Sequence, residues 1–209
     1  MSDCCNDKAC EIEALRDRQG RVLKTVLVIN ALMFGVEFTA GTLAGSVSLV
    51  ADSLDMLGDA LVYGFSIYVL TQGARMKALS AQIKGSVMGL FGLVALVQVV
   101  YAVATPHVPG YETIGVIGLL ALVANGVCFA LLWHHRSDDV NMSSVWLCSR
   151  NDLIANVSVL VAAMGVGLTA SSWPDIVVGL ALALLFMKSA VTVLGQARSE
   201  MRMAAPDYS

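Results

Sequence analysis

Three aspartates lie on a single stripe of an apolar stretch. Asp52, Asp55 and Asp59 are separated by three and four residues, and on a helix of 3.6 residues per turn these positions share one face. A carboxylate near the centre of a bilayer costs about 2.5–3.5 kcal/mol on insertion scales, and three like charges on one face repel each other. The stripe therefore predicts a partner for the carboxylates, which can be a cation, protons or a basic side chain.

A second stripe of polar residues occurs in the fifth of the apolar stretches. Cys148, Asp152 and Asn156 recur at intervals of four residues, and thiolate, carboxylate and amide oxygen can all bind metal ions. Two helices that each present a ligand pair four residues apart can close a tetrahedral site, which is the geometry that zinc prefers. The predicted metal ligands are Asp55, Asp59, Cys148 and Asp152.

Alternatives to metal binding exist for several of these groups. Asp52 can sit near the outer mouth of a bundle or accept a hydrogen bond from nearby backbone, and Asn156 can join two helices by a hydrogen bond. Both are therefore weaker candidate ligands. Arg150 can neutralise one aspartate, and Lys188 can extend to the membrane interface. Such ion pairs would account for one or two carboxylates but not for four ligands on two helices.

Other polar residues within apolar stretches have two interpretations. Asn30 and Glu37 lie seven residues apart, and Asn125 stands in the middle of a later stretch. Each can bridge two helices or line an ion path, and we favour bridging. Cys128 is expected to behave as a small buried apolar side chain.

Two groups outside the apolar stretches can also bind metal. Cys4, Cys5 and Cys10 place three thiols within seven residues, which is enough to chelate a soft or borderline ion, although a polar tail can also hold cysteines without a role. His134 and His135 fall at the end of a stretch, where interfacial solvation and a metal-collecting mouth are the two alternatives.

The composition indicates an all-α membrane protein. Apolar residues make up 57% of the 209 residues and charged residues 14%, whereas soluble domains have about 45–50% and about 25%. A helix needs about 20 mostly apolar residues to cross a bilayer. Six stretches meet this need and predict six transmembrane helices, near Val22–Leu43, Ser48–Gln72, Lys84–Ala104, Thr113–His134, Val145–Ala170 and Pro174–Leu194.

The basic residues predict the orientation. Lysine and arginine occur before the first stretch, between the second and third, between the fourth and fifth, and after the sixth, while the three other connections have none. The positive-inside rule then places both termini in the cytoplasm, and a bacterial inner membrane is the expected location by analogy. We expect a cytoplasmic N-terminal tail over 1–21, a six-helix transmembrane domain over 22–195 and a short cytoplasmic C-terminal tail over 196–209.

These residues resemble the cation diffusion facilitator family of metal transporters. The stretch Ser46–Ala60 is similar to the family's motif in the second span, with Asp55 and Asp59 as the ligand pair. The fifth-span motif matches at Asp152 and Asn156. The resemblance implies a bundle like the cation-efflux transmembrane domain, a homodimer, and export of divalent metal from the cytoplasm in exchange for protons.

Two departures from the family pattern affect this expectation. Cys148 stands where histidine is usual, and a thiolate shifts a site toward softer ions. We therefore expect Zn²⁺ first and Cd²⁺ second, with Co²⁺, Ni²⁺, Fe²⁺ and Mn²⁺ as further possibilities. Because the sequence ends at Ser209, we also expect the family's cytoplasmic C-terminal regulatory domain to be absent and the transmembrane helices to hold the dimer together.

Other function classes receive less support from the sequence. No basic patch with interleaved aromatic residues predicts nucleic-acid binding, and no nucleophile elbow or phosphate-binding loop predicts an enzyme. No cofactor is expected besides the transported metal. A passive metal facilitator or channel, and a non-transporting membrane metal sensor, remain alternatives to a proton-coupled transporter.

Overall fold

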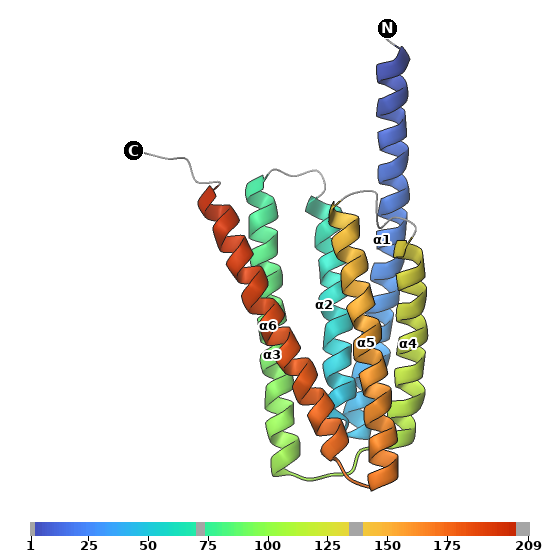
Figure 1. The fold of residues 1–209 in the computed structure, drawn as a ribbon, viewed down its shortest axis with the longest axis vertical. Coiled ribbons are helices and arrows are strands. Elements are labelled where there is room, and N and C mark those ends of the chain that lie inside the picture. Colours follow the sequence, from blue (N-terminus) through green and yellow to red (C-terminus); the bar gives the residue numbers. More distant parts are fainter. Residues whose placement is uncertain (1–2, 70–73, 134–139, 204–209) are drawn as a thin grey trace.

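The part of the chain that the structure describes folds as six α-helices (Figure 1). The computed structural model describes residues 3–69, 74–133 and 140–203, without the side chains of 3–19, 62, 65, 66, 68, 69, 74–81, 84, 140–148, 150, 151 and 196–203. Within these ranges every regular element is a helix, as predicted. The helices are α1 (Asp3–Ala44), α2 (Val47–Val69), α3 (Ala74–Ala104), α4 (Tyr111–Trp133), α5 (Val140–Thr169) and α6 (Trp173–Met203).

Several helices are longer than the apolar stretches that predicted them. α1 begins at Asp3 rather than near Val22, and α6 continues to Met203. Hydropathy locates the part of a helix that a bilayer can cover, but the backbone hydrogen bonds can continue beyond it into polar sequence. The segment before Val22 contains alanine, leucine, glutamate and arginine, which are good helix formers. The additional turns of both helices extend at the end of the bundle that carries the termini (Figure 1).

Among the described residues, five helices have the length and composition needed to cross a bilayer. Their apolar segments are Gly20–Ala44, Gly85–Ala104, Tyr111–Trp133, Asp152–Thr169 and Trp173–Gly195. α2 differs because it carries three acidic residues in its apolar sequence. Every stretch of 18 residues within Val47–Val69 contains Asp52, Asp55 and Asp59. The helix that departs from an ordinary membrane composition is therefore the one that carries the proposed chemistry.

The surface of the bundle is apolar and part of its interior is polar. Large hydrophobic side chains such as Leu43 and Leu168 are 84% and 89% exposed, whereas Glu37 and Asn156 are fully buried. A soluble domain of this size would hide its large apolar side chains from water. The inverted distribution fits a protein whose outer surface faces lipid, where intramembrane polar groups turn toward the bundle interior.

The helices pack as two groups that touch along α2 and α5. α1 packs extensively against α2, α4 packs against α5, and α1 also contacts α4, whereas α3 pairs most extensively with α6. Figure 1 shows the α3–α6 pair beside the other four helices, with α6 approaching α5 at the end opposite the termini. The central apolar core draws on α2 through α6, with Leu54, Ala155 and Ala183 among its members.

A short turn between α1 and α2 determines where the aspartate helix begins. The N–H of Gly45 donates to the carbonyl of Thr42, and the N–H of Ser46 donates to the carbonyl of Gly41, which is the Schellman pattern of a helix end. Gly45 has a φ of +67°, a conformation that glycine adopts without the penalty that a Cβ would bring. Ser46 then caps α2, because its Oγ accepts the N–H of Leu49 at 3.1 Å.

Gly179 allows α6 to approach the start of α2 closely. A Cβ at this position would lie 2.7 Å from Cγ1 of Val47 and 3.1 Å from its backbone carbonyl carbon. We therefore expect Gly179→Ala to push the two helices apart and to lower stability by about 1–3 kcal/mol. Heat-induced unfolding of the purified protein in detergent measures this change. Gly126→Ala is the control, because a Cβ there meets no atom within 4 Å, and equal unfolding of both variants would contradict the prediction.

Candidate metal centre

Asp175 of α6 holds the first turn of α2 in place. Its carboxylate accepts hydrogen bonds from Ser46 Oγ at 2.7 Å, from the N–H of Val47 at 2.7 Å and from the N–H of Ser48 at 3.2 Å. The Ser48 hydroxyl is a further partner. Asp175 is 1% exposed, and it satisfies two of the N–H groups that every helix start leaves without an intrahelical partner. α2 is thus anchored by a side chain from a different helix.

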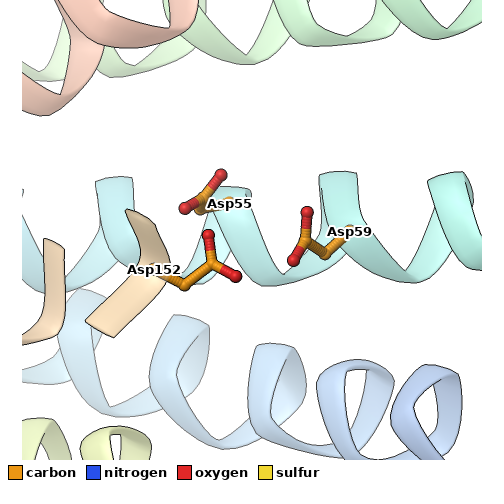
Figure 2. Close-up of side chains that lie close together, drawn as sticks. All are labelled: Asp55, Asp59 and Asp152. Carbon is orange, nitrogen blue, oxygen red and sulfur yellow. The ribbon is translucent and has the colours of Figure 1, made fainter. Parts of the chain in front are cut away.

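Three of the predicted ligands meet between α2 and α5. One carboxylate oxygen each from Asp55, Asp59 and Asp152 lies within 4.8 Å of the others. Figure 2 shows Asp55 and Asp59 one turn apart on α2, with the Asp152 carboxylate extending from α5 toward them. Asp152 is 9% exposed, and Asp55 interacts electrostatically with Asp59. Such a cluster of carboxylates presents several oxygen donors to one small volume.

Cys148, the fourth predicted ligand, lies on α5 one turn before Asp152. Its side chain is not among those that the structure describes. The same holds for the side chains of six other residues that the sequence singled out, which are Cys4, Cys5, Cys10, His134, His135 and Arg150. Residues four apart on a helix occupy the same face. The backbone position of Cys148 therefore matches the predicted second ligand stripe, while ligation by its thiol stays a prediction.

Tyr63 is a neighbour of the cluster that the sequence reasoning missed. Its hydroxyl donates to Oδ2 of Asp59 at 3.1 Å, and the ring is 1% exposed. The available signal was its position four residues after Asp59, which continues the aspartate stripe by one turn. A hydrogen bond to a carboxylate fixes the direction of its second oxygen, so Tyr63 orients Asp59 toward the cluster.

Asp52 and Asn156 lie together in a hydrogen-bonded pair. Nδ2 of Asn156 donates to Oδ2 of Asp52 at 2.6 Å, and Nδ2 of Asn125 on α4 donates to Oδ1 of Asn156 at 2.8 Å. Asn125 and Asn156 therefore bridge helices, which is the alternative that the sequence left open for each of them. Asp52 is not part of the three-carboxylate cluster, although it interacts electrostatically with Asp55.

Asn30 of α1 and Cys128 of α4 form a contact between these two helices. Nδ2 of Asn30 donates to the carbonyl of Val26 at 2.9 Å and approaches Cys128 Sγ at 3.9 Å. Cys128 is 1% exposed and belongs to an apolar cluster with Leu23 and Leu132. Both residues thus contribute to helix packing between α1 and α4, as predicted.

The arrangement can neutralise a divalent cation in an apolar surrounding. Burying an isolated charge is prohibitive unless it is paired or bound to a metal, and the cluster brings carboxylates from two helices within reach of one ion. Carboxylate oxygen is one of the ligands that zinc accepts, at a distance of about 2.0–2.2 Å. A site shared by two helices can also change when the helices move.

Comparison with known proteins identifies the family of the chain. A family model described as "Cation efflux transmembrane domain" matches residues 23–201. The chain belongs to this family. The family resemblance predicted from the residues is therefore confirmed, and with it an integral, multi-pass, all-α membrane protein.

Curated relatives of the family carry zinc in their names. The chain is similar to "Zinc transporter ZitB" of Yersinia pestis, with 23% identity over 206 residues, and to "Zinc transporter ZitB" of Escherichia coli (strain K12), with 25% identity over 204 residues. In both comparisons 91% of this chain is covered, and the chain spans about 65% of the length of the relatives.

Proposed function

We propose that the protein is a divalent metal cation efflux transporter whose first substrate is Zn²⁺. The observation that carries the proposal is the cluster of Asp55, Asp59 and Asp152 in the interior of a membrane bundle. Carboxylates at such a position are expensive and therefore functional by default. The zinc transporters to which the chain is similar support the choice of metal.

Cys148 is the fourth ligand in this proposal. Three carboxylates alone would suit hard cations such as Mg²⁺ or Mn²⁺ equally well, whereas a thiolate adds preference for zinc and for softer ions. Zn²⁺ accepts sulfur and oxygen ligands in a tetrahedral site. We therefore propose Cd²⁺ as the second substrate, ahead of Co²⁺, Ni²⁺, Fe²⁺ and Mn²⁺.

The chemistry of the ligands supplies a reason for proton antiport. A thiol and a carboxyl group must both be deprotonated to bind metal, so metal binding releases protons. Three carboxylates and a thiolate carry more negative charge than a divalent ion neutralises, and this surplus leaves room for protons. We propose that metal entering from the cytoplasm displaces protons, and that protons entering from the opposite side expel the metal.

Alternating access would accompany this exchange. Both ligand helices contribute to the cluster, so a joint movement of α2 and α5 against the rest of the bundle can expose it to either side without separating the ligands. The basic residues in the connections support cytoplasmic termini. We also propose that the protein is a homodimer held by its transmembrane helices in a bacterial inner membrane. In the sequence, two cytoplasmic tails at 1–21 and 196–209 would flank the transmembrane domain at 22–195.

Zinc uptake into liposomes tests the proposed function. The purified full chain is reconstituted into vesicles that hold a zinc-sensitive dye, and Zn²⁺ entry is followed with and without an acidic lumen. We expect the acidic lumen to accelerate uptake, because each unit of pH difference adds about 1.4 kcal/mol of driving force per exchanged proton.

The other outcomes discriminate between function classes. A rate of Zn²⁺ uptake that does not depend on the pH gradient would contradict proton antiport and would indicate a passive facilitator. Vesicles that never take up Zn²⁺, although the protein binds it in solution, would favour a metal sensor. Protein-free vesicles with the same gradient correct for leakage.

A further inference from the structure

A polar layer crosses the bundle immediately beyond the carboxylate cluster. It takes one side chain from each of four helices, and all four side chains are buried. Its members are Glu37 of α1, Asp52 of α2, Asn125 of α4 and Asn156 of α5, with exposed fractions of 0%, 2%, 3% and 0%. Along α2 the order from the end with the termini is Asp59, Asp55 and then Asp52, so this layer lies on the far side of the cluster from the termini (Figure 1).

The two asparagines orient Asp52 within this polar layer. The hydrogen bonds run in one direction, from Asn125 to Asn156 and from Asn156 to Asp52. The amide of Asn156 thus accepts with its oxygen and donates with its nitrogen, and its donated hydrogen bond engages Oδ2 of Asp52. These contacts explain why Asp52, Asn125 and Asn156 are tolerated in the interior. These contacts do not explain how the buried carboxyl group of Glu37 is tolerated in the interior.

Glu37 is a buried carboxylate without a hydrogen-bond donor. Neither Oε1 nor Oε2 meets an amide or hydroxyl donor, and both atoms are hidden from solvent. The side chain within hydrogen-bonding reach of Glu37 is another carboxylate, that of Asp52. The electrostatic neighbours of Glu37 are Asp52 and Asp55, which are acidic as well. An unpaired charge in such a place is strongly destabilising, and neighbouring carboxylates increase the penalty. The position therefore calls for a positive charge between Glu37 and Asp52, which a bound cation or a shared proton can supply.

We propose that Glu37 and Asp52 form a second cation-binding site, built from oxygen ligands, which receives the divalent ion from the carboxylate cluster on its way across the bundle. This inference rests on the proposed transport function for its role, but the site itself is a statement about binding. Two carboxylates balance the charge of one divalent ion. Because the pair contains no sulfur, it should accept hard ions such as Mn²⁺ that a thiolate site disfavours.

Mn²⁺ binding to the purified full chain tests this site. Bound Mn²⁺ is measured by electron paramagnetic resonance in an Asp152→Ala background, which weakens the carboxylate cluster. We expect this background to retain one Mn²⁺ ion per chain, and the addition of Glu37→Gln to weaken its binding by at least about tenfold. Cys4, Cys5 and Cys10 contribute little to this measurement, because thiolates favour softer ions.

Matched variants keep the result interpretable. Glu112→Gln is the same substitution at the exposed start of α4, and it should leave Mn²⁺ binding unchanged. Glu37→Gln preserves shape and removes a buried charge, so it should fold, and Asp52→Asn should remove the same ion. Unchanged Mn²⁺ binding in both Glu37→Gln and Asp52→Asn would overturn the proposal and indicate a shared proton instead.

Failure of this site is distinguishable from failure of the proposed function. A protein that binds Mn²⁺ through Glu37 but never moves Zn²⁺ into liposomes would retain the site and lose the transport role. A protein that transports Zn²⁺ but shows no Mn²⁺ binding dependent on Glu37 would retain the transport function and lose the second site.

Discussion

Replacing Asp152 with alanine should reduce zinc uptake into liposomes at least about 100-fold. The substitution removes the carboxylate that α5 contributes to the cluster with Asp55 and Asp59, so the remaining ligands from that helix would be too few to hold the ion between α2 and α5. Changes to groups that merely support a metal ligand already reduce affinity or activity by about 10–100-fold. A direct ligand should exceed this range. The measurement is the initial rate of dye response with an acidic lumen.

Two further variants separate ligation from folding. Asp152→Asn keeps the volume of the side chain and removes its charge, so we expect a similarly large loss of uptake with unchanged heat-induced unfolding. Glu112→Ala removes an exposed carboxylate on α4, and it should transport at the wild-type rate. Wild-type uptake by both Asp152 variants would exclude the cluster from the transport path and would leave the cluster a structural feature of the interior.

The sequence predicted the fold because membrane insertion constrains composition strongly. Each helix needs about 20 apolar residues, and this requirement is visible without knowledge of tertiary contacts. The ends of α1 and α6 were less predictable, since hydropathy does not report helical hydrogen bonding in polar sequence. The helical stripes of Asp55, Asp59 and Asp152 were equally visible, because charges in apolar stretches stand out and the helical period assigns them to faces.

Partners that come from other helices were beyond sequence reasoning. Nothing in the spacing of Glu37 indicates that it lies beside Asp52, because the approach of α1 to α2 is a tertiary contact. The link from Asn125 through Asn156 to Asp52 likewise joins three helices. Asp175 is the clearest case, since its partners Ser46 and Ser48 precede it by about 130 positions. In each case the residue type predicted a polar interaction, and only the packing identified its partner.

Replacing Asp175 with alanine should destabilise the protein by about 3–5 kcal/mol, because the change leaves buried donors without an acceptor. The carboxylate lies in the first turn of α6 and against the first turn of α2, and a negative charge is favourable at both helix N-termini. Its loss would expose the N–H groups of Val47 and Ser48 to an apolar surrounding. Heat-induced unfolding in detergent measures the effect, with a large decrease in unfolding temperature as the expected result.

A graded series tests whether the hydrogen bonds of Asp175 cause this effect. Ser48→Ala removes one hydroxyl donor and leaves the backbone N–H groups paired, so it should destabilise by only about 1 kcal/mol. Asp175→Asn retains one acceptor oxygen and should fall between the two. The hydrogen bonds of Asp175 anchor the start of the helix that carries Asp55 and Asp59. We therefore expect Asp175→Ala also to weaken zinc binding in the fraction of protein that remains folded. If Asp175→Ala unfolds at the wild-type temperature, the hydrogen bonds of Asp175 do not stabilise the start of α2, and the prediction is wrong.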